Sequence, residues 1–273
     1  MCQIILKDKS EIAYVRNRFP WYQLNSQITD NQTGKIITII PDKHKGSTQA
    51  LGMLLLELWI VQSKKETIME IIKQYYYYED QQEINHILEV LYERLLTKEP
   101  LGQASSEVRE ELLQLLISEL DTPAPFDFDA CIAHHDKHFQ LLMISEVGYA
   151  IDECKQEEQY QHFIQSLREY IKNQPDKTRI LHIVQGEPFT FYNEKGHRYT
   201  AEELQFHIQK EPIYIVGLDE DELNITPIIT LLPTYIYIYG QDPNDAKTTA
   251  VQTIFQERVA FKSLQSFPFT PIN

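Results

Sequence analysis

The feature that most constrains the fold is one long helical pattern over residues 126–173. Its apolar residues recur at three- and four-residue intervals, which places them on one face of an α-helix. The charged run Lys155-Gln156-Glu157-Glu158-Gln159 interrupts that face. The sequence therefore predicts a helix that is exposed or kinked at residues 155–159. The apolar group before the run is Phe139, Leu142, Met143, Val147, Ala150, Ile151 and Cys154, and the group after it is Tyr160, Phe163, Ile164, Leu167 and Ile171.

The helical pattern ends at Gln174-Pro175, because proline disfavours helix at the residue before it. Strand-like residues follow from Arg179. We therefore expect two domains, residues 1–177 with a β unit and a helical region, and residues 178–273. We also expect Tyr160, Phe163 and Leu167 of the second group to pack on the helices at residues 47–96.

The flanking segments predict an α+β fold. Residues 1–41 contain strand-like runs at 3–6, 22–28 and 35–40 and a short helix that ends before Pro20, which indicates a small β-α-β-β unit at the N-terminus. Residues 47–122 have helical periods broken near Pro100, so the middle is mainly helical. The C-terminal part is expected to be α/β with a hairpin. Its expected strands lie at 179–184, 189–192, 213–216 and 235–239, and its helices at 201–209 and 245–255.

Composition limits the class of partner and the compartment. The 273 residues carry a formal net charge of −15, which disfavours binding to nucleic acid or to an anionic membrane surface. No stretch approaches the roughly 18–20 apolar residues of a membrane span, and the N-terminus lacks the apolar core of a signal peptide. The three cysteines show no CxxC spacing, which is typical of a reducing compartment. We expect a cytoplasmic protein with no membrane partner.

No catalytic signature is present in the sequence. It lacks GxGxxG, GxxxxGK[ST], HEXXH and GxSxG, so the balance is against an enzyme and no cofactor is expected. The weak candidates for metal ligands are Cys131, His134 and His138, because two histidines four residues apart share one helix face. The simpler interpretation is a solvated helix face, since metal sites usually gather ligands from several elements. We therefore predict no metal.

Four consecutive tyrosines end the helical pattern before residue 80. Because a helix turns by about 100° per residue, Tyr75, Tyr76, Tyr77 and Tyr78 cannot all face one core. Either the protein packs around them, or some of them form an exposed aromatic surface that contacts a partner. These four residues are our candidate interaction site.

Several short blocks resemble a known family. They are Ala150-Ile151-Asp152-Glu153 followed by Gln159-Tyr160 and Phe163-Ile164, YYYEDQQE at residues 76–83, FTFYNEKG at 189–196, and FQERV at 255–259. With these blocks the sequence resembles the YtxC-like family of sporulation proteins. The resemblance implies an association with endospore formation, and it supplies neither an activity nor catalytic residues.

These observations favour a non-enzymatic, sporulation-associated cytoplasmic protein that acts through protein–protein contacts. Its partner would be an unknown protein or a second copy of the chain. Two alternatives stay open. One is an enzyme or metal-binding protein that uses the helix around His134 and His138. The other is a nucleic-acid-associated factor, which the net charge disfavours.

Overall fold

The computed structural model describes residues 2–22, 24, 26–31, 34–39, 47–97, 103–122, 124–210 and 224–269. Its contacts divide the chain into two compact units, Met1–Gln156 and Glu157–Asn273. The division falls inside a helix, whereas we expected a domain boundary at residues 177–178. Independent folding of residues 178–273 stays a prediction.

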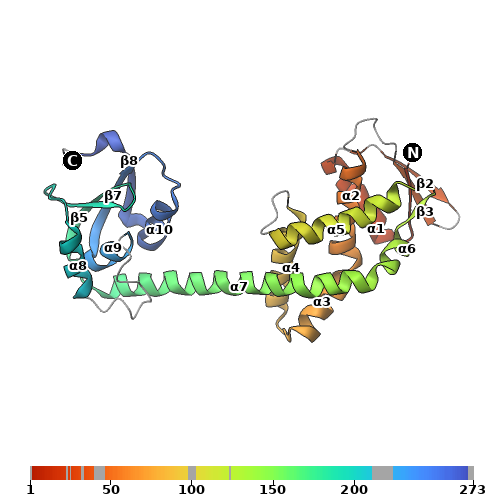
Figure 1. The fold of residues 1–273 in the computed structure, drawn as a ribbon, viewed down its shortest axis with the longest axis horizontal. Coiled ribbons are helices and arrows are strands. Elements are labelled where there is room, and N and C mark those ends of the chain that lie inside the picture. Colours follow the sequence, from red (N-terminus) through yellow and green to blue (C-terminus); the bar gives the residue numbers. More distant parts are fainter. Residues whose placement is uncertain are drawn as a thin grey trace. The chain divides into compact units, whose positions relative to one another are not determined.

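A four-stranded sheet opens the first unit. β1 (Cys2–Leu6) lies between β3 (Gly34–Ile39) and β4 (Phe126–Asp127), and β2 (Ser26–Asn31) forms the far side of β3 (Figure 1). β1 and β2 each pair antiparallel with β3, and β4 pairs parallel with β1. With α1 (Lys9–Arg18) between β1 and β2, the β-α-β-β unit is confirmed, and β4 extends it.

Helices make up the rest of the first unit. Asp80 begins one of them, because its carboxylate accepts hydrogen bonds from the backbone N–H groups of Gln82 and Glu83 at 2.8 and 2.9 Å. Two π-helical turns, Leu58–Ser63 and Ile71–Tyr75, flank α3. The helices after β3 are α2 (Ser47–Glu57), α3 (Lys65–Glu70), α4 (Gln81–Leu96), α5 (Gln103–Leu120) and α6 (Phe128–His134).

The core of the first unit joins the sheet to these helices. Trp59 and Phe139 are fully buried and stack with ring centroids 5.0 Å apart. Ile4 and Leu6 of β1 belong to the same cluster. Each buried side chain of this size contributes roughly 1.5–3 kcal/mol relative to its exposed state. On α4 one face is buried in this core, and its residues Ile84, Ile87, Leu88, Leu91 and Leu95 are all at most 2% exposed.

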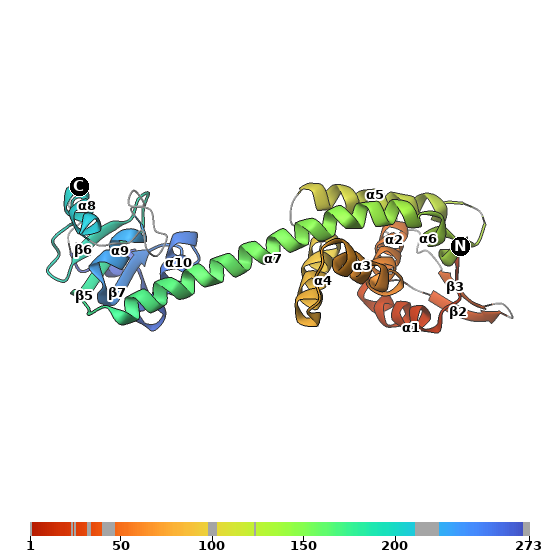
Figure 2. The same cartoon turned by 90° about the horizontal axis from the view of Figure 1, so that it is seen from below.

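α7 (Asp136–Asn173) is the long helix that the sequence predicts, but it begins at Asp136 and not at Phe126, because β4 and α6 precede it. Figure 2 draws it in green, with α5 alongside its first turns, as Figure 1 also shows. Residues 155–162 are exposed, which confirms the expected interruption. The first apolar group is buried in the first unit, apart from Leu142, which is partly buried there. Ile164, Leu167 and Ile171 belong to the core of the second unit.

The second unit is built on a mixed sheet in the order β6-β5-β7-β8. β5 pairs antiparallel with β6 and parallel with β7, and β7 pairs parallel with β8. The strands are β5 (Thr178–Val184), β6 (Thr190–Asn193), β7 (Pro233–Gly240) and β8 (Val259–Ser263), and the helices are α8 (Ala201–Gln209), α9 (Thr226–Leu231) and α10 (Ala246–Phe255).

The two faces of this sheet differ. Ile236 and Ile238 of β7 are fully buried in a cluster that includes residues of α7, α8, α9 and α10. The alternate residues of β7 are tyrosines and point to the other face. There the segment after β8 crosses the sheet as a strap (residues 264–269). Phe267 meets Tyr239 edge to face with ring centroids 5.1 Å apart, and Phe269 meets His182 edge to face with centroids 5.2 Å apart.

The α+β class, the helical middle and the C-terminal hairpin are therefore confirmed. The expected strand at residues 213–216 lies outside the described residues. The prediction that Tyr160, Phe163 and Leu167 pack on residues 47–96 is wrong. Leu167 and Phe163 pack in the second core, and Tyr160 is 45% exposed. No helix in the described part of the chain is both long and apolar enough to cross a membrane.

Candidate functional site

The segment with the candidate metal ligands spans two helices. α6 ends at His134 and α7 begins at Asp136, so His134 and His138 do not belong to one helix. The rings of His134 and His135 meet edge to face with centroids 4.8 Å apart. Nε2 of His138 lies 2.7 Å from Oε1 of Glu111 on α5, and this contact ties the start of α7 to α5.

The chemistry of these side chains also works against a metal site. Burial raises the pKa of the Cys131 thiol to about 11, and a metal requires the thiolate. Burial, and then the charge of His134, lowers the pKa of His135. Among the described residues, no three His, Cys, Asp or Glu side chains are grouped to hold a metal ion.

The four tyrosines form a fixed turn between α3 and α4. The hydroxyl of Tyr76 donates a hydrogen bond to the carbonyl oxygen of Ile144 on α7 at 2.6 Å. A Cβ at position 148 would lie only 2.6 Å from this hydroxyl, so the close approach of Tyr76 depends on Gly148. Tyr77 has a φ of 61°, a backbone region that bulky residues rarely adopt. The turn is therefore held by Tyr76.

In this turn two of the tyrosines are partly buried and two are exposed. Tyr76 and Tyr78 pack against the first core. Tyr75 is 59% exposed and Tyr77 is 84% exposed. We call Tyr75 and Tyr77 the tyrosine patch.

A cleft of about 360 Å³ lies at the carboxyl ends of the parallel strands of the second unit. Gln185 and Gly186 follow β5, Gly240 ends β7 and Gln241 follows it, and Leu264 follows β8. Ligands of α/β proteins bind at this edge of a parallel sheet, because the loops that leave the strands diverge there. Residues 185–188 join the expected strands at 179–184 and 189–192, and the sequence alone did not indicate a cleft there.

Gln185 holds the wall of the cleft. Its Oε1 accepts a hydrogen bond from the backbone N–H of Gln241 at 3.0 Å, and its Nε2 donates to the carbonyl oxygen of Asp242 and to Oγ1 of Thr248, each at 2.7 Å. A Cβ on Gly240 would lie 1.7 Å from Oε1 of Gln185. Glycine is therefore required at this position for the side chain of Gln185 to cross the loop.

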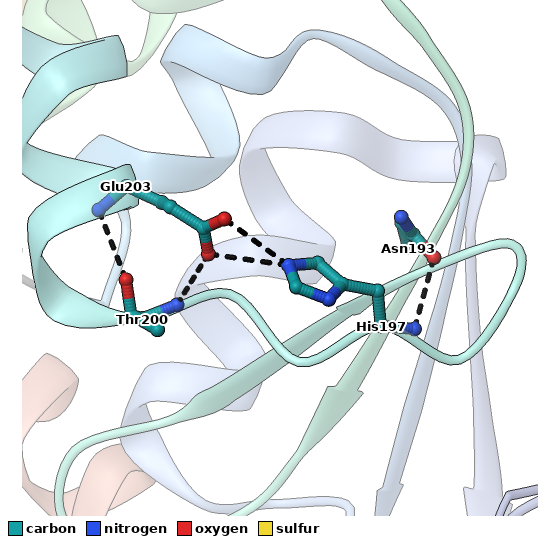
Figure 3. A network of polar contacts seen from close by, with 4 residues as sticks. All are labelled: Asn193, His197, Thr200 and Glu203. Atoms are coloured by element: carbon teal, nitrogen blue, oxygen red, sulfur yellow. Dashed lines mark hydrogen bonds and ion pairs between the residues drawn. The ribbon is translucent and has the colours of Figure 1, made fainter.

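A polar network leads from β6 into α8 (Figure 3). The hydroxyl of Thr200 accepts the backbone N–H of Glu203 at 3.2 Å, and the Glu203 carboxylate accepts the backbone N–H of Thr200 at 2.8 Å. Nε2 of His197 lies 3.2 Å from the same carboxylate, and Asn193 accepts the backbone N–H of His197. The pKa of the Glu203 carboxyl is lowered first by the hydrogen bond from the backbone N–H of Thr200, and then by the hydrogen bond with His197. This arrangement is a capping box that fixes the loop.

The comparisons with known proteins identify a family. A 226-residue segment is 26% identical to "Uncharacterized protein YtxC" of Bacillus subtilis (strain 168) and covers 78% of this chain and 76% of that protein. No solved structure matches the chain. The sequence model of the YtxC-like family matches residues 49–260. Because this match covers more than half of the sequence, the chain belongs to the YtxC-like family.

Proposed function

We propose that this protein acts in endospore formation through contacts with another protein, and that the tyrosine patch is the contact surface. The support for the sporulation context is the family resemblance of the sequence blocks. The support for a contact function is the geometry of the turn at residues 75–78.

The observation that carries the proposal is the exposure of two tyrosines on a rigid turn. Tyr77 exposes 84% of its surface while its neighbour Tyr76 is pinned to Ile144. Large aromatic side chains that are already held in place lose little conformational entropy on binding, and they are enriched among the residues that dominate interface energies. A turn that fixes Tyr75 and Tyr77 in water therefore suits a protein interface.

The charge around the patch indicates the kind of partner. Glu79 and Asp80 follow the turn directly. The pKa of Tyr76 is raised, first by burial, then by Tyr75 and then by the charge of Asp152 on α7. The whole chain carries −15, so two copies repel each other. We infer a partner with a basic surface that places apolar side chains on Tyr75 and Tyr77.

The test is a double variant of this protein, made in the gene of the host cell. Tyr75→Ser combined with Tyr77→Asn removes both rings, and asparagine tolerates the positive φ at residue 77. Crosslinking in sporulating cells should capture a basic protein with the natural chain and lose it with the variant, and spore yield should fall in parallel.

A matched control removes an exposed ring elsewhere. Phe206 on α8 is 57% exposed and lies outside the patch, so Phe206→Ser should leave both the crosslink and the spore yield unchanged. Normal spore yield in the double tyrosine variant, with its fold intact by circular dichroism, would refute the proposal.

A further inference from the structure

The cleft of the second unit is a second candidate site, independent of the tyrosine patch. After β5 the chain turns back into the neighbouring strand β6, and after β7 it continues into α10. The two loops part at the carboxyl edge of the sheet and leave the cleft between them. This edge is where α/β sheets bind small ligands.

The walls of the cleft are preformed. The hydrogen bonds of Gln185 join the loop after β5 to the loop after β7, and they end on Thr248, which is fully buried. The backbone N–H of Phe189, another lining residue, donates to Oδ1 of Asn224 at 3.1 Å. A cavity that needs no rearrangement binds its ligand without an ordering cost.

The charge of the lining selects for a cation. Glu187, Asp242 and Asp245 all line the cleft. Each uses one carboxylate oxygen within the protein: Oε2 of Glu187 pairs with Lys247, Oδ1 of Asp242 accepts from the N–H of Asn244, and Oδ2 of Asp245 accepts from Thr248. Among the contacts of the described residues, the second oxygen of each carboxylate makes no hydrogen bond. Three carboxylates with one lysine leave the cleft negative.

An anion is disfavoured at the same place. A helix N-terminus attracts anions through its unpaired N–H groups, and α10 begins at the edge of this cleft. At this helix, however, Asp245 itself caps the first turn by accepting the backbone N–H of Thr248 at 3.0 Å. The protein already supplies the negative group, so phosphate-like ligands meet repulsion.

The rest of the lining consists of Gln185, Gln241, two glycines and two apolar side chains. Phe189 and Leu264 face the cleft together with two glycines. A ligand that matches both parts has a cationic head for the carboxylates and an alkyl stem for the rings and methyl groups. We propose that the cleft binds an alkylammonium group, such as the end of a lysine side chain or of a small polyamine.

The experiment uses the full chain and three probes in calorimetric titrations. Nα-acetyl-lysine methylamide and cadaverine carry the ammonium group, and Nα-acetyl-norleucine methylamide has a similar stem without the charge. We expect saturable binding of at least one amine and no binding of the norleucine derivative. Tighter binding of the lysine derivative assigns the site to a protein side chain, and tighter binding of cadaverine assigns it to a free polyamine.

Two double variants locate the site. Asp242→Asn with Asp245→Asn removes two charges while asparagine preserves the cap of α10. It should weaken amine binding by at least about tenfold, because hydrogen bonds to charged groups are the strong ones. Glu194→Gln with Glu257→Gln makes the same charge change at exposed positions outside the cleft and should leave binding unchanged. Absence of saturation with both amines, binding of the norleucine derivative, or equal weakening in both variants would overturn the proposal.

Discussion

Leu167→Ala tests the division of α7 between two cores. Leu167 is fully buried in the second core, whereas the exposed run at residues 155–162 separates it from the first. Truncating a buried leucine removes its transfer free energy and leaves a cavity, which costs about 3 kcal/mol. For a unit the size of Glu157–Asn273, this loss lowers the melting temperature by roughly 10 °C.

The positions of the tryptophans make the assay specific. The chain has 2 tryptophans, Trp21 and Trp59, and both lie in the first unit. Tryptophan fluorescence therefore follows unfolding of Met1–Gln156, while far-ultraviolet circular dichroism follows both units. We expect Leu167→Ala to move one part of the circular dichroism transition and to leave the fluorescence transition in place.

Two further variants complete this test. Phe139→Ala should do the reverse and shift the fluorescence transition, because Phe139 stacks on Trp59. Tyr160→Ala changes an exposed residue of the same helix and should alter stability by less than about 0.5 kcal/mol. If Leu167→Ala shifts the fluorescence transition as much as the dichroism, the chain unfolds as one cooperative body and the reasoning fails.

Three other predictions concern a buried carboxyl group, the metal content of the protein and a helix cap. Burial is the main cause of the raised pKa of Glu11, so its stabilising contribution is complete below the usual value of 4.5 and is lost as the pH rises through the folded pKa. Glu11→Gln should remove this dependence in urea titrations followed by fluorescence, and an unchanged pH profile would contradict it. Protein prepared without an affinity tag should contain no stoichiometric transition metal, since the Cys131 thiol stays protonated and His138 contacts Glu111. Elemental analysis that finds about one metal ion per chain, lost in His138→Ala, would show the opposite. Thr200→Ala should destabilise the second unit by about 1 kcal/mol through loss of the α8 cap, measured by dichroism, and a neutral effect would argue against the capping box.

Local patterns predicted the elements well where one physical rule governs them. The alternation of Tyr235, Ile236, Tyr237, Ile238 and Tyr239 predicted a strand, and Ile236 and Ile238 are fully buried while Tyr235 is 53% exposed. Pro175 predicted the end of the long helix, which the structure places at Asn173. β4 was missed because two residues, Phe126 and Asp127, carry no period.

Long-range packing could not be read from the same patterns. The helical period of Ile164, Leu167 and Ile171 shows that they share a face, but it does not say which core covers that face. The cleft was missed for a related reason. Its lining comes from loops after three different strands, and each loop alone has only ordinary turn residues such as Gly186 and Gly240. Only the parallel pairing of β5, β7 and β8 brings these loops together.

The limits of the family match cut through both hydrophobic cores. The match begins at residue 49, after β1 and β3, yet Ile4, Leu6 and Phe19 are buried with Trp59. It ends at residue 260, before the strap whose Phe267 and Phe269 cover Tyr239 and His182. A fragment trimmed to the shared segment would lose β1, β2 and β3 of the first sheet and uncover the aromatic face of the other. Fragments made for crystallisation or binding studies should therefore retain residues 2–39 and 261–269, and relatives that lack either piece must cover these surfaces with other residues.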